Sequence, residues 1–144
     1  MVQQDKDLLL QDLCARLPYG VKGLRVYNNE EIVTLNGILP KCTSNLIEGA
    51  GIKFVELQFS NLDCCSIDKF KPYLRPLQSM TEEECLQFSR LKPSTCDAWK
   101  YLKTPVPLHI ANLAQFDFFH SHHLDWRGLI EKELALDCTN HNIY

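Results

Sequence analysis

The octapeptide IKFVELQF, residues 52–59, carries the clearest strand signal in the chain. Its residues alternate between one face with Phe54, Glu56 and Gln58 and another with Val55, Leu57 and Phe59. Alternation with a period of two is typical of a β-strand that buries one face. Turn-forming residues separate this run from three similar ones, VKGLRVY, EIVTLNGIL and LDCCSI. We therefore predict an antiparallel β-meander over residues 21–67, which can close into a small SH3-like barrel.

Helical spacing replaces this alternation on the N-terminal side of the β region. Residues 5–17 place leucines three and four positions apart, and Pro18 and Gly20 follow them. This pattern predicts one helix before the sheet. On the other side, residues 71–78 contain Pro72 and Pro76, so we expect that segment to be extended.

A helical region is predicted over residues 81–136. It opens with Thr81 and Glu84, which have the spacing of a capping box. We expect three or four helices there: one after this box, a short one from Ser94 or Thr95, a longer one over 108–120, and a last one capped by Asp125. No repeat or linker divides the sequence, so the predicted fold is a single α+β domain over residues 1–144.

Composition and charge narrow the class of protein. Apolar residues make up 45% and charged residues 23% of the chain, which is a globular composition rather than a disordered one. The net charge of −3 supplies no basic surface for phosphate neutralisation, so we expect no general nucleic-acid binding. No apolar run approaches the length of a membrane span, and the N-terminus lacks a basic region before an apolar one.

Seven cysteines are many for this length, and an odd number cannot pair fully within one chain. With no secretory signal in the sequence, we interpret them as free thiols in a reducing cytoplasm. The adjacent pair Cys64 and Cys65 would face opposite sides of a strand. No C-x-x-C spacing occurs, which argues against a zinc ribbon.

Catalytic and metal-binding patterns are weak. The densest group of potential ligands is His120, His122, His123 and Asp125, but its spacing matches no established zinc signature. Pairing Cys138 with His141, or Cys85 with His123, would bring a thiol to a base, yet buried filler is the expected role of these cysteines. We therefore predict no catalytic residues, no metal site and no cofactor.

Aromatic rings beside arginines give a stronger indication of recognition. Tyr73 and Arg75 lie in the extended segment, and Trp126 and Arg127 adjoin the predicted last helix. Rings stack on nucleobases and guanidinium groups bind phosphate, so both pairs suit a nucleotide. The predicted ligand-binding residues are Tyr73, Arg75, His123, Asp125, Trp126 and Arg127. The alternative is that the rings are core residues and the arginines neutralise nearby carboxylates.

Three segments carry a resemblance to known proteins: DLLLQDLCARLPYGVKG from Asp7, KPYLRPLQSMTEEE from Lys71, and HHLDWRGLIEKELAL from His122. Together they resemble a family of small proteins from phages and prophages of gut bacteria (Bacteroidota). The sequence departs from the family pattern at Glu133, where glycine is usual, and residues 41–52 match nothing in it. The resemblance implies a phage context and brings no activity with it.

Three classes of function follow. The first is a phage-encoded counter-defence protein that sequesters a small nucleotide-type immune signal in the cytoplasm of the infected bacterium, without catalysis. Because such pockets are often completed between subunits, we expect a homo-oligomer. The alternative is a protein–protein interaction module that acts on a host or phage protein through an apolar helical face. A hydrolase of a nucleotide signal, using the cluster from His120 to Asp125, is the third.

Overall fold

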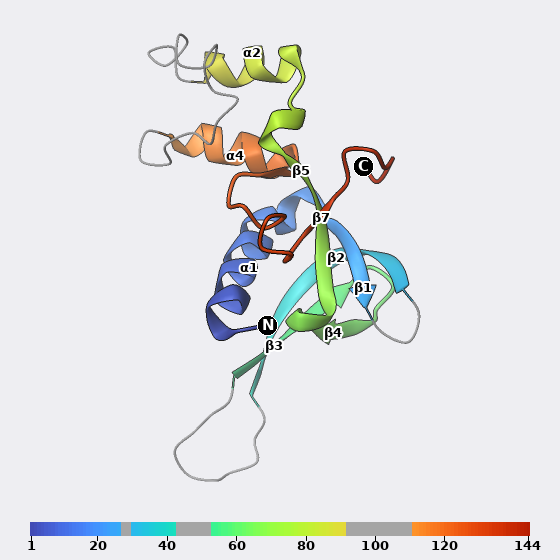
Figure 1. Cartoon of the computed structure of the whole chain (residues 1–144). Coiled ribbons are helices and arrows are strands. Elements are labelled where there is room, and N and C mark those ends of the chain that lie inside the picture. The colour runs from blue at the N-terminus through green and yellow to red at the C-terminus, as the bar shows by residue number, and fades with distance from the viewer. Residues whose placement is uncertain (27–29, 43–52, 92–110) are drawn as a thin grey trace. The chain divides into compact units, whose positions relative to one another are not determined.

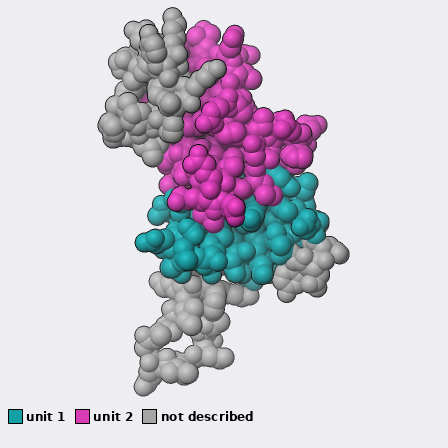
Figure 2. Space-filling model, viewed as in Figure 1, with its two compact units in different colours: residues 1–73, 144 teal, residues 74–143 magenta. Residues whose placement is uncertain are grey.

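The computed structural model describes residues 1–26, 30–42, 53–91 and 111–144. It has mixed α and β content, as the sequence predicts, with a seven-stranded, mostly antiparallel sheet and three described helices. The chain divides into two compact units, residues 1–73 with Tyr144 and residues 74–143 (Figure 2). That the whole chain is one folding domain stays a prediction.

Unit 1 contains the predicted helix and the predicted meander. Helix α1 (Gln3–Arg16) precedes four strands, β1 (Lys22–Val26), β2 (Glu30–Cys42), β3 (Lys53–Phe59) and β4 (Cys64–Ser66), shown in Figure 1. Successive strands pair antiparallel, with Leu24 opposite Ile32 and Leu57 opposite Cys65. The four strand signals of the sequence are thereby confirmed.

The predicted closure into a barrel is not found, because the sheet is open. Strand β5 (Phe70–Pro76) follows a short 3-10 turn, η2 (Ile67–Lys69), and pairs with β1. The strand order is β4-β3-β2-β1-β5-β6, with β7 also on β5, so no pairing among the described strands joins β4 back to β5. Long β2, cyan in Figure 1, pairs with β1 before a register shift at Asn36 and with β3 mainly after it. A bulge of this kind bends a strand without requiring closure.

Buried apolar residues from α1 and the strands form the core of unit 1. Leu9 and Leu13 of α1 are fully buried, whereas Cys14, which follows Leu13, is exposed. The absence of a side chain at Gly23 lets the ring of Phe70 pack directly against the backbone of β1, because a Cβ at Gly23 would collide with that ring. The core residues are Leu9, Leu13, Val21, Val33, Leu35, Leu57, Phe59, Cys65, Ile67 and Phe70.

The core of unit 1 also contains a buried ion pair. Asp12 and Arg16 are both fully buried on α1, and Arg16 Nε lies 2.6 Å from Asp12 Oδ2. A spacing of four residues places the two side chains on one helical face, so the pair is local in origin.

Unit 2 begins with the second half of β5 and two described helices. Helix α2 (Glu82–Arg90) starts with the predicted capping box: Thr81 Oγ1 accepts from Glu84 N–H at 3.2 Å, and Thr81 N–H donates to Glu84 Oε2 at 2.8 Å. Helix α4 (Leu113–Ser121) starts with a second box, between Asn112 and Gln115, which the sequence reading missed. The predicted start at residue 108 and the short helix from Ser94 or Thr95 lie outside the described residues.

The predicted last helix is wrong. Residues 126–135 form turns between two short strands, β6 (Leu124–Asp125) and β7 (Leu136–Asp137). Gly128 has a φ of 70° and Glu133 a φ of 57°, left-handed values that a right-handed helix cannot contain. The apolar residues that suggested a helix are buried from turns instead, among them Leu129 and Leu134. The helical region therefore ends at Ser121 rather than at residue 136.

The predicted extended segment is confirmed over most of its length. Strand β5 covers residues 70–76, and a 3-10 turn, η3 (Leu77–Ser79), completes the segment. Strand β6 pairs with β5 in parallel, with Arg75 opposite Leu124. No helix in the described ranges is both long enough and apolar enough to cross a membrane.

Candidate functional site

The predicted ligand-binding residues belong to different units. Tyr73 is in unit 1, where its carbonyl accepts a hydrogen bond from the Tyr144 hydroxyl at 2.8 Å. The other five lie in unit 2.

Arg75 is held by a carboxylate. Its Nη1 and Nη2 each donate to one oxygen of Glu84 at 2.9 Å, a bidentate ion pair. Nη2 also donates to the Ser79 carbonyl at 2.9 Å, and Nε donates to the Ser79 hydroxyl at 3.2 Å. Mainly through the hydrogen bond from Arg75, the pKa of Glu84 falls from 4.5 to about 2. This is the neutralising role that the sequence left open as the alternative.

Asp125 and His123 form hydrogen bonds that hold the surrounding backbone in place. The two carboxylate oxygens of Asp125 accept from Leu129 N–H at 2.9 Å and Ile130 N–H at 2.8 Å. The His123 carbonyl accepts from Arg75 N–H at 2.8 Å, which is part of the β5–β6 pairing. Both side chains are buried. They shape the loop that the sequence assigned to a helix.

Trp126 belongs to an aromatic cluster. Its ring packs against a core of Phe88, Phe118, Phe119 and Leu124. The indole Nε1–H donates to His120 Nε2 at 3.1 Å, and the Arg127 guanidinium carbon lies 4.1 Å from the centre of the ring. A guanidinium over an indole face is a favourable cation–π contact. Arg127 thus covers one part of the ring that a base was expected to use.

The cavity next to Trp126 does not fit a nucleotide. It holds about 130 Å³, below the volume usual for ligand pockets. Asp125 and Glu131 are its charged wall residues, and neither Arg75 nor Arg127 lines it. A cavity of this size, with no cation among its described wall residues, is unsuited to a nucleotide. The structure does not assemble the predicted residues into an anion site.

The cysteine–histidine combinations lack an activated thiol. Burial raises the pKa of both Cys85 and Cys138 above the ordinary value, so both thiols are neutral near pH 7. Among the described residues, no three His, Cys, Asp or Glu side chains converge as metal ligands. In the part of unit 2 that the structure describes, no hydrogen bond joins a cysteine thiol to a histidine.

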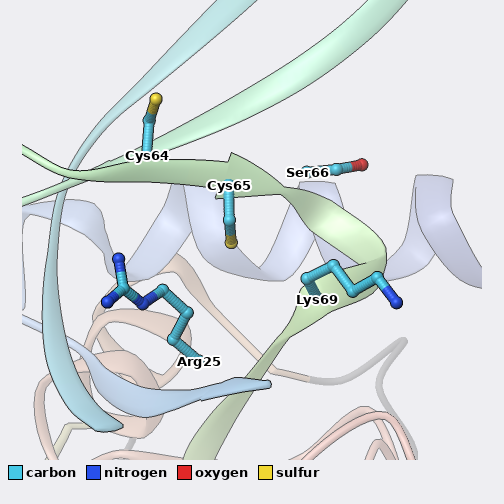
Figure 3. A pocket seen from close by; sticks show the side chains of 5 residues that line it. All are labelled: Arg25, Cys64, Cys65, Ser66 and Lys69. Atoms are coloured by element: carbon cyan, nitrogen blue, oxygen red, sulfur yellow. The ribbon is translucent and has the colours of Figure 1, made fainter. Parts of the chain in front are cut away.

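A larger pocket lies in unit 1, where we predicted no site from the sequence. It holds about 520 Å³, within the range of small-molecule sites. Figure 3 shows its five lining residues, which come from β1, β4 and the adjoining turn: Arg25, Cys64, Cys65, Ser66 and Lys69. The two cysteines point to opposite sides of β4, as strand geometry requires, and the Cys65 thiol points to the side on which Arg25 lies.

Arg25 is the principal charged group of this pocket. Its Nη1 donates to Asp63 Oδ2 and its Nη2 to Glu31 Oε2, both at 2.6 Å. The hydrogen bond that Arg25 donates to Asp63 is the main reason that the pKa of Arg25 is raised. The Nε atom is buried and has no hydrogen-bond partner among the residues that the structure describes. The guanidinium is thus held beside the pocket by Asp63 and Glu31.

Cys65 lines the pocket with an uncharged thiol. Burial is the main cause that raises its pKa to about 11, although Arg25 acts in the opposite direction. The thiol is therefore protonated at physiological pH and is a poor nucleophile. The sequence did not reveal the pocket because Arg25 and Cys65 are far apart in the chain and their approach depends on strand register. The alternation along β4 was the one signal that could have placed Cys65 inward.

Comparisons with known proteins add no relative: no family model, no curated protein and no solved structure matches the chain.

Proposed function

We propose that this protein is a non-catalytic binding protein that holds a small anionic ligand in the pocket of unit 1. The observation that carries the proposal is a hollow of about 520 Å³ lined by Arg25, whose guanidinium attracts an anion. Lys69 supplies a second cation on the wall.

The resemblance to phage proteins suggests which anion to test first. A phage factor inside an infected bacterium encounters nucleotide signals of the immune response, and these carry phosphate. Sequestration requires tight binding and no turnover, so a guanidinium and a protonated thiol suffice without a general acid or base. We therefore propose a cytoplasmic counter-defence role for the pocket, with a nucleotide-type ligand.

A homo-oligomer is part of the proposal. Strand β4, which contributes three of the five lining residues, is the terminal strand of the sheet. An exposed strand edge is a natural pairing surface for a second copy. Pairing there would cover the pocket and slow the escape of a ligand. Light scattering after size exclusion measures the mass directly, and a monomer at all concentrations contradicts this part.

The deciding experiment is incubation with a panel of cyclic and ADP-ribose-type nucleotides, followed by gel filtration, heat release and chromatography. Intact released ligand supports sequestration, and altered ligand indicates an enzyme. The variant Lys69→Glu should retain less ligand. Lys132→Glu, which makes the same charge change at an exposed site in unit 2, should retain as much as the wild type.

A second candidate, an interaction module, has one observation in its favour. Helix α4 presents Leu113, which is 88% exposed, beside a shallow hollow of about 480 Å³. Large apolar side chains gathered at a surface often mark protein contacts. If no nucleotide is retained, the variants to examine are Leu113→Ser and Phe116→Ser in a co-purification experiment from infected cells. Loss of the same captured protein in both variants would favour this candidate.

A further inference from the structure

The small cavity of unit 2 has walls that suit a cation. It is lined by the end of β5, the turn after it, strand β6 and the loop that follows β6. We propose that this cavity is a site for a quaternary ammonium group, the trimethylammonium head of a choline-like compound. The proposal goes beyond the anion pocket of unit 1 and is independent of it, because every residue that carries it lies in unit 2.

The charged residues on the cavity wall are both carboxylates. Asp125 and Glu131 line it, and no lysine or arginine is among its described lining residues. Glu131 is exposed, and its Oε2 lies 3.9 Å from the position that a Cβ on Gly128 would take. Arg127, whose guanidinium lies over the Trp126 ring, adds one positive charge nearby. Two carboxylates and one guanidinium leave a net charge of about −1, which attracts a cation.

Trp126 supplies an aromatic wall. The indole face attracts cations through its quadrupole, and this contact strengthens when the cation is withdrawn from water. The ring already makes one such contact, since the Arg127 guanidinium carbon lies 4.1 Å from its centre. Arg127 does not line the cavity, so a guest and this guanidinium would contact different parts of the ring.

The hydrogen-bond acceptors of the lining are largely occupied, which favours a quaternary over a primary ammonium. Four backbone carbonyls already accept hydrogen bonds, those of Pro76, Leu77, Gly128 and Ile130. Both Asp125 oxygens accept backbone N–H groups. A primary ammonium has three N–H donors and would lose hydrogen bonds to water on entering such a cavity. A quaternary ammonium has the same charge and no donor, so it escapes this loss.

The size of the cavity agrees with this guest. At roughly 30 Å³ of liquid volume for each water molecule, 130 Å³ is room for about four such molecules. A trimethylammonium group, with one nitrogen and three methyl carbons, needs a space of this order. Its methyl groups can contact the apolar wall formed by Pro76, Leu77 and Ile130.

The test is a set of two-dimensional ¹H–¹⁵N NMR titrations of the full-length protein with choline, 3,3-dimethylbutan-1-ol and ethanolamine. The butanol has the shape of choline with an uncharged carbon in place of the nitrogen, and ethanolamine has a primary ammonium. We expect choline to shift the Trp126 indole and the Gly128 and Glu131 amides, and to bind at least about fivefold more tightly than either other compound. Equal binding of the butanol, equal binding of ethanolamine, or no shift of these signals with choline would overturn the proposal.

A variant separates charge from shape. Glu131→Gln keeps the length of an exposed side chain and removes its charge. We expect choline to bind about fivefold more weakly and the butanol to bind as before. The matched control is Glu83→Gln, an exposed change in α2 away from the cavity lining, which should leave both affinities unchanged. The same choline affinity in Glu131→Gln as in the wild type contradicts the charge argument.

Phosphatidylcholine carries the same head group, and vesicles distinguish this source from a soluble one. In the lipid a phosphate follows the ammonium group closely, and Asp125 and Glu131 would repel it. We therefore expect a soluble ligand, with the protein left in the supernatant when phosphatidylcholine vesicles are sedimented. Sedimentation with the vesicles that free choline reverses would contradict the soluble source.

Discussion

Arg75 and Glu84 form a bidentate ion pair in which both guanidinium Nη atoms lie 2.9 Å from the carboxylate. Glu84 Oε2 also accepts the Thr81 N–H of the capping box at 2.8 Å. One carboxylate thus joins the end of β5 to the start of α2. The segment from Lys71 to Glu84 is therefore a structural clamp, and its arginine is occupied within the fold.

The first prediction concerns this clamp. Because Arg75 lowers the pKa of Glu84 from 4.5 to about 2, the pair stabilises the folded state above pH 4.5. Full expression of that shift is worth about 3 kcal/mol, and solvent contact reduces the expected contribution to about 2 kcal/mol. Glu84→Gln should lose this amount in urea unfolding at pH 7. The difference from the wild type should shrink below pH 4.5 and vanish near pH 2.

Glu83→Gln is the control for this variant. It changes the same charge in the same helical turn, where Glu83 is exposed and accepts a bond from Gln87 at 3.4 Å. We expect a loss below about 0.5 kcal/mol. Equal losses in the two variants would mean that the ion pair contributes nothing beyond the charge at the helix start.

The second prediction concerns the loop after β6. Asp125→Ala removes the acceptor of two backbone N–H groups and should destabilise the protein by about 3 kcal/mol. Asp125→Asn keeps one acceptor oxygen and should cost about half as much. Thermal and urea unfolding measure both. Glu131→Ala, an exposed change in the same loop, should be nearly neutral, and a similar loss there would argue against the Asp125 bonds as the cause.

The third prediction concerns Glu133, which has a φ of 57°. A side chain strains the left-handed conformation, and glycine relieves that strain at a smaller entropic cost. Glu133→Gly should therefore raise stability by about 1 kcal/mol. The resemblance points the same way, since the family pattern usually has glycine there. Lys132→Gly, one residue earlier and without a positive φ, should lower stability.

The fourth prediction concerns the two adjacent thiols. Cys64 is exposed, while burial raises the pKa of Cys65 to about 11, so little Cys65 thiolate exists at pH 8. Iodoacetamide should modify Cys64 first, as fragment-ion mass spectrometry of their shared peptide will reveal. Cys64→Ser should remove the fast reaction of that peptide, and Cys65→Ser should leave it. Fast labelling of Cys65 would show that the pocket wall is open to reagent.

The strands could be predicted because each carries its signal locally. Alternation in residues 53–59 places Leu57 and Phe59 on one buried face whatever their partners are. The capping box at Thr81 and Glu84 is equally local, since its two hydrogen bonds join residues three apart. Such features depend only on residues that are close in the sequence, so they can be predicted from the sequence alone.

The last helix and the candidate site could not be predicted in this way. Buried Leu129 and Leu134 mimic helical spacing, but the bonds to Asp125 and the left-handed Glu133 turn the chain instead. Arg75 was predicted to bind a ligand, whereas its partner in the structure is Glu84, and that pairing depends on how β5 leads into α2. The approach of Arg25 to Cys65 depends on the pairing of several strands, which no short motif encodes.

The central claim is that the ligand sits beside Arg25 and Cys65 and away from Trp126. The most direct measurement is a two-dimensional ¹H–¹⁵N NMR titration of the protein with 3′,5′-cyclic AMP, with assigned backbone amides and tryptophan side chains. The account predicts that the largest shifts fall on Arg25 and residues 64–69, while the Trp126 indole and the Arg75 amide keep their positions. Shifts confined to Arg75 and residues 123–127 would contradict it.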